Sequence, residues 1–109
     1  MLKELQKVRD VLEEVAHVYV ETTVMGAALK EEDCGNGWLT FVSSKATEII
    51  LDINNMIYTD VGYCEYFTIH SKIMILCAYM AGPTTQLVKD WLRELMDADN
   101  AVIRALISI

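Results

Sequence analysis

Hydrophobic residues recur at intervals of three and four along most of the chain, which is the spacing of one face of an α-helix. The first such stretch predicts a helix over residues 2–29. Its heptad-like apolar stripe consists of Leu5, Val8, Leu12, Val15 and Tyr19. Charged residues occupy the opposite side, so we expect this helix to cover a core with one face.

A second amphipathic helix is predicted in the middle of the chain, beginning at Ser43 or Ser44, because serine is a favourable N-cap residue. Its apolar face consists of Ala46, Ile49, Ile50, Ile53, Met56 and Ile57. A last helix is predicted after Pro83, with Thr84 or Thr85 as its cap. The polar run at residues 97–100 interrupts that pattern, so residues 101–109 either continue the helix or restart it at Asn100.

Residues 66–82 form the most apolar stretch of the chain. On a helix, only a narrow strip with Glu65, Thr68 and Lys72 is polar, which is typical of a helix at the centre of a bundle or of a membrane span. The uninterrupted apolar run from 73 to 82 is shorter than the ~20 residues that a span requires. We therefore expect a core helix that its neighbours cover.

The resulting fold class is all-α: a compact antiparallel four-helix bundle, a single domain over residues 1–109, with one longer loop at residues 30–42. An α+β alternative remains open. Residues 38–42 are apolar and β-prone, and residues 63–70 also alternate with the period of a strand. These two segments would then form a short hairpin.

Composition and charge narrow the possible partners. Sixteen acidic and nine basic residues give a formal net charge of −7. This charge argues against direct binding to nucleic acid or to an anionic membrane, because both need basic residues. It favours a basic protein partner. The apolar fraction of 53% exceeds the usual ~45–50%, so we also expect a dense core or a face for another subunit, such as a homodimer interface.

Residues with catalytic or metal-binding chemistry are few. Cys34, Cys64 and Cys77 have neither disulfide-type pairing nor zinc-ligand spacing, which is typical of reduced thiols in the cytoplasm. Glu14 and His17 match one Glu-x-x-His motif, but a di-iron bundle needs two, with further inward-facing carboxylates. His70 lies among apolar residues, where we expect a hydrogen-bonded core histidine. We therefore predict no catalytic residue, no metal and no cofactor.

The leading functional hypothesis is a non-catalytic protein-binding module, an acidic inhibitor of the immunity or anti-defence type. Its partner would be a basic protein such as a nuclease or a nucleic-acid-binding complex. The predicted contact residues combine an acidic run with two aromatic anchors: Glu31, Glu32, Asp33, Trp38 and Phe41. Two alternatives are a structural subunit of a homo-oligomeric or larger helical assembly, and a small ligand-binding or catalytic bundle centred on His70.

Overall fold

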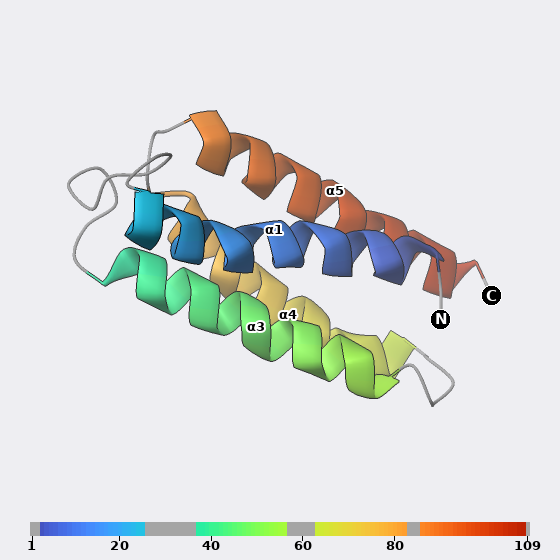
Figure 1. The fold of residues 1–109 in the computed structure, drawn as a ribbon. Helices are drawn as coiled ribbons and strands as arrows, with labels where there is room; N and C mark the ends of the chain where they lie inside the picture. The colour runs from blue at the N-terminus through green and yellow to red at the C-terminus, as the bar shows by residue number, and fades with distance from the viewer. Residues whose placement is uncertain (1–2, 26–36, 57–62, 83–85, 109) are drawn as a thin grey trace.

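The computed structural model describes residues 3–25, 37–56, 63–82 and 86–108, nearly all of them helical. The four helices of these segments are α1 (Lys3–Met25), α3 (Trp38–Met56), α4 (Tyr63–Met80) and α5 (Gln86–Ile107). They run alternately in opposite directions, with both chain ends at the same end of the molecule (Figure 1). Each helix packs on the next, and α5 closes the bundle against α1. The predicted all-α antiparallel four-helix bundle is confirmed.

The core is built from the apolar stripes that the sequence predicts for three of the helices. In α1, Leu5, Val8, Leu12 and Val15 are buried together. The buried stripe of α3 includes Ala46, Ile49 and Ile53, and that of α5 includes Val88, Trp91, Leu95 and Val102. Burial of a side chain such as leucine or isoleucine stabilises a fold by ~1.5–3 kcal/mol. These stripes therefore supply most of the driving force for assembling the bundle.

Helix α3 begins at Trp38, five or six residues before the predicted start at Ser43 or Ser44. The Phe41 backbone N–H donates to the Gly37 carbonyl at 3.0 Å, and Gly37 has a φ of 78°, which favours glycine. Residues 38–42 are therefore helical, and so are residues 63–70, so the α+β alternative is wrong. Ser43 and Ser44 lie inside the helix rather than at its cap. The rest of the predicted loop, residues 30–36, lies outside the described residues.

Helix α5 is continuous through the polar run at residues 97–100, so it does not restart at Asn100. The run does not break the helix because its members point in different directions. Asp97 and Asn100 are exposed, whereas Ala98 and Asp99 are buried. The predicted caps Thr84 and Thr85 lie outside the described residues.

The neighbours of helix α4 cover one of its faces but not the whole helix, so the expectation of a fully covered core helix holds for that face alone. Among the described helices, α4 packs on α3 and α5 but not on α1. One face is buried, but Phe67, Ile75 and Tyr79 are each about half exposed on the other sides. A square of four helices gives each helix only two close neighbours, so a helix that is apolar all round keeps an exposed apolar face. Among the described helices, none is both long enough and apolar enough to cross a membrane.

Candidate functional site

Three aromatic side chains meet where the start of α3 lies beside the end of α4. The rings of Phe41 and Tyr79 pack at a centroid distance of 4.1 Å and a tilt of 33°. The indole Nε1 of Trp38 donates a hydrogen bond to the Tyr79 backbone carbonyl at 2.8 Å. Phe41 is 37% exposed and Tyr79 is 49% exposed. We call Trp38, Phe41 and Tyr79 the aromatic corner.

The aromatic corner contains both aromatic residues predicted for partner binding. Trp38 is half-buried against the core, so it positions its neighbours more than it faces outward. Phe41 is on the surface. The acidic residues Glu31, Glu32 and Asp33 lie outside the described residues. Tyr79 was missed, because only the pairing of α3 with α4 brings it to Phe41.

A second polar cluster lies inside the bundle between α4 and α5. The carboxylate of Asp99 is fully buried, with 0% exposure. Its Oδ1 accepts a hydrogen bond from the Tyr66 hydroxyl at 2.7 Å, and its Oδ2 lies 2.6 Å from Nδ1 of His70. The two partners lie one helical turn apart on α4, so one carboxylate can meet both.

The contact with Asp99 orients the His70 ring. An ionised carboxylate can only accept hydrogen bonds, so Nδ1 of His70 is the donor to it. The His70 side chain is about one-quarter exposed. Burial and the hydrogen bond to Asp99 raise the pKa of Tyr66 above its usual value, so the phenol stays protonated. The arrangement can hold an oriented imidazole.

The sequence predicts a hydrogen bond for His70 but does not identify Asp99 as the partner. A signal for Asp99 was present, because it lies four residues after Leu95 and three before Val102 on the apolar stripe of α5. A charged residue on such a stripe is rarely buried unless it is paired. The sequence pattern places it in the polar run at residues 97–100 instead.

The contacts of Lys72 and Cys77, two other ionisable residues of α4, belong to the packing of the bundle. Lys72 of α4 contacts Asp52 at 2.6 Å and Glu48 at 2.9 Å, which ties α4 to α3. The Lys72 hydrogen bond, with a further contribution from Lys45, lowers the pKa of Glu48, and the bond to Asp52 raises the pKa of Lys72.

Burial, followed by the charge of Asp99, raises the pKa of the Cys77 thiol to about 11, so this thiol is unreactive near neutral pH.

Glu14 and His17, which form the single Glu-x-x-His motif of the sequence, are both exposed on α1. In the part of the chain that the structure describes, no group of three or more His, Cys, Asp or Glu side chains is placed to hold a metal ion.

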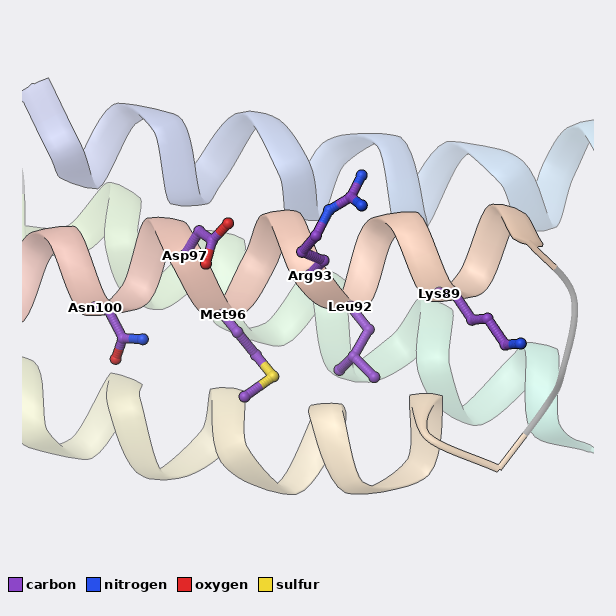
Figure 2. Close-up of a pocket in the computed structure, with 6 residues that line it drawn as sticks. All are labelled: Lys89, Leu92, Arg93, Met96, Asp97 and Asn100. Atoms are coloured by element: carbon purple, nitrogen blue, oxygen red, sulfur yellow. The ribbon is translucent and has the colours of Figure 1, made fainter.

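A shallow pocket of about 390 Å³ lies along α5. Leu92, Met96 and Asn100 line it on the side nearer α4, and Arg93 and Asp97 on the side nearer α1 (Figure 2). Lys89 completes the lining, and His70 is not part of it. One helix supplies every lining residue, so the pocket is an open groove with mixed charges, to which we assign no ligand.

Comparison of the chain with protein-family models, with curated proteins and with solved structures gives no match.

Proposed function

We propose that this chain is a non-catalytic protein-binding module that docks on a basic protein through the aromatic corner. The observation that carries the proposal is the exposed ring pair of Phe41 and Tyr79. Both rings stand on helices, and the Trp38 hydrogen bond joins the two helices beside them. Rings that are already ordered lose little conformational freedom on binding, so more of the contact energy remains as affinity.

The chemistry of the partner follows from charge. The net charge of −7 attracts a basic protein and speeds the encounter with it. Glu31, Glu32 and Asp33 precede the aromatic corner by only a few residues of chain. In this proposal they supply an acidic rim around the aromatic anchors. A cytoplasmic inhibitor of a nuclease or of a nucleic-acid-binding complex, of the immunity or anti-defence type, fits this combination.

A substitution at Phe41 tests the role of the ring pair. Because the exposed ring is the proposed anchor, Phe41→Ala should weaken the captured complex by roughly tenfold or more. Leu51→Ala is the matched control, since Leu51 is also on α3 and is 58% exposed but lies away from the corner. The complex is captured from the native host, identified by mass spectrometry and measured by surface plasmon resonance.

The same complex tests the acidic rim. Reversing Glu31, Glu32 and Asp33 to lysine should reduce the association rate and flatten its dependence on salt. Equal affinities for Phe41→Ala and Leu51→Ala, together with an unchanged salt dependence of the reversed protein, would refute docking at this corner.

A second candidate, a small catalytic or ligand-binding bundle, is favoured by the pairing of His70 with Asp99. A buried acid that orients an imidazole is an arrangement that enzymes use for proton transfer. His70→Gln should then abolish the biological activity in the native host while circular dichroism shows an intact fold. The control is His17→Gln, the other histidine of the chain, which is exposed on α1. Full activity of a folded His70→Gln protein would remove this candidate.

A further inference from the structure

Helix α4 carries two heptad-like stripes on opposite faces. One is buried in the bundle and includes Tyr66, Ile69, Ile73, Leu76 and Met80. The other faces outward and consists of Cys64, Phe67, Ser71, Met74 and Ala78 of the helix, continued by Ala81 in the turn directly after it. We call the second set the outer stripe. Intervals of three and four along an apolar stripe are the pattern by which one helix packs along another.

The outer stripe is suited to contact with protein rather than with water. It contains no charged side chain, although Phe67 is 53% exposed and Met74 is also exposed. Its one polar member, Ser71, donates its hydroxyl to the Phe67 carbonyl of its own helix at 3.0 Å. Ser71 can therefore be buried without losing this hydrogen bond. Ile75, about half exposed, widens the apolar surface along one edge.

We propose that the outer stripe packs antiparallel against the same stripe of a second copy, which makes the chain a two-fold symmetric homodimer. The order of large and small side chains along the stripe supports this pairing. With the two-fold axis between Lys72 and Ile73, Phe67 faces Ala78 of the partner subunit and Met74 faces Ser71 of the partner subunit. Cys64 then faces Ala81 of the partner subunit at each end. Each large side chain meets a small one, which lets the two helices approach closely and leaves few voids.

The antiparallel arrangement is favoured over the parallel one by the same residues. Parallel pairing in register would place Phe67 against Phe67 and Ala78 against Ala78 of the partner subunit, which crowds one layer and leaves the other empty. A two-fold contact uses one surface patch twice, so it needs a patch that is complementary to itself. The outer stripe meets that requirement over a length of about 26 Å.

The outer stripe shares no residue with the aromatic corner. The outer stripe points away from the bundle, whereas Phe41 and Tyr79 lie at the contact between α3 and α4. The dimer therefore does not depend on the proposed binding function, and each can fail without the other.

Cysteine cross-linking tests the arrangement of the two helices. In a Cys34→Ser background, adding Ala81→Cys places a new thiol opposite Cys64 of the partner subunit. Oxidation with copper–phenanthroline, in which oxygen accepts the two electrons and the two thiol protons are released, should give a covalent dimer. The Cys34→Ser protein with its native Cys64 should stay uncross-linked, because the two Cys64 thiols lie at opposite ends of the seam. A Cys64–Cys64 dimer in that control would indicate parallel pairing and overturn the proposal.

Sedimentation equilibrium tests the interface itself, with and without a charge placed in it. Phe67→Lys should weaken self-association by roughly 30-fold or more, because it places a lysine in the buried layer of each copy. Leu51→Lys adds the same charge at a similarly exposed apolar position on α3 and should change self-association by less than about threefold. The proposal is overturned if the wild-type chain is a monomer at 0.1 mM, or if both variants weaken self-association equally.

Discussion

At the scale of single residues, Asp99 departs most from what its residue type would suggest. It is a carboxylate with no exposed surface, whereas the other buried side chains of the described helices are hydrophobic. A buried charge is tolerated only where hydrogen bonds replace the water that it has lost. Here one oxygen meets the Tyr66 hydroxyl and the other meets His70. These bonds connect α4 to α5 at a defined register, which apolar contacts alone specify less strictly.

Replacing Asp99 by asparagine should destabilise the protein by about 2–3 kcal/mol at pH 7. The asparagine amide has nearly the same shape as the carboxylate, but it is uncharged. Its NH2 group would face either the Tyr66 hydroxyl or His70, and each of these already donates a hydrogen bond. The change is measured as the shift of the urea unfolding midpoint. Asp97→Asn, two residues away and exposed, is the control and should stay within about 0.5 kcal/mol of wild type. Equal midpoints for the two variants would mean that the buried bonds contribute no net stability.

At the scale of helices, the hydrophobic periodicity predicted which faces of the amphipathic helices pack into the core. The apolar stripes of α1, α3 and α5 could be read directly, and the residues in them are buried. The start of α3 could not be predicted from the sequence. Gly37 permits the helix to begin there, but residues 38–42, which follow it, favour strands. The outward face of α4 was also missed. An apolar residue shows that a surface avoids water, but it does not show which neighbour covers it.

Only the residues of the candidate site that lie close together in the sequence were predictable. Phe41 and Trp38 stood out because aromatic residues follow an acidic run within the same stretch of chain. Their partner Tyr79 is 38 residues from Phe41, and Asp99 is 29 residues from His70. Such pairs depend on the relative register of two packed helices. A single sequence contains no direct measure of that register, so the contacts had to come from the structure.

At the scale of the whole molecule, the net charge of −7 should affect the two proposed contacts in different ways. The aromatic corner is proposed to meet a basic partner, which the charge of −7 attracts. The outer stripe is proposed to meet a second copy, which carries the same negative charge and is repelled. Apolar contact supplies the affinity in both cases, so charge decides mainly how each contact depends on salt.

Raising NaCl from about 0.05 to 0.5 M should therefore change the two associations in opposite directions, because the screening length falls below the distance between exposed charges. Capture of the basic partner should weaken by roughly tenfold, while self-association should strengthen by about two- to fivefold. Plasmon resonance measures the first and sedimentation equilibrium the second. The chain with Glu31, Glu32 and Asp33 reversed to lysine is the control, since it has lost most of its net charge and both salt dependences should flatten. If salt weakened self-association in the wild-type chain, ion pairs would hold the two copies together, and the uncharged outer stripe could not be the interface.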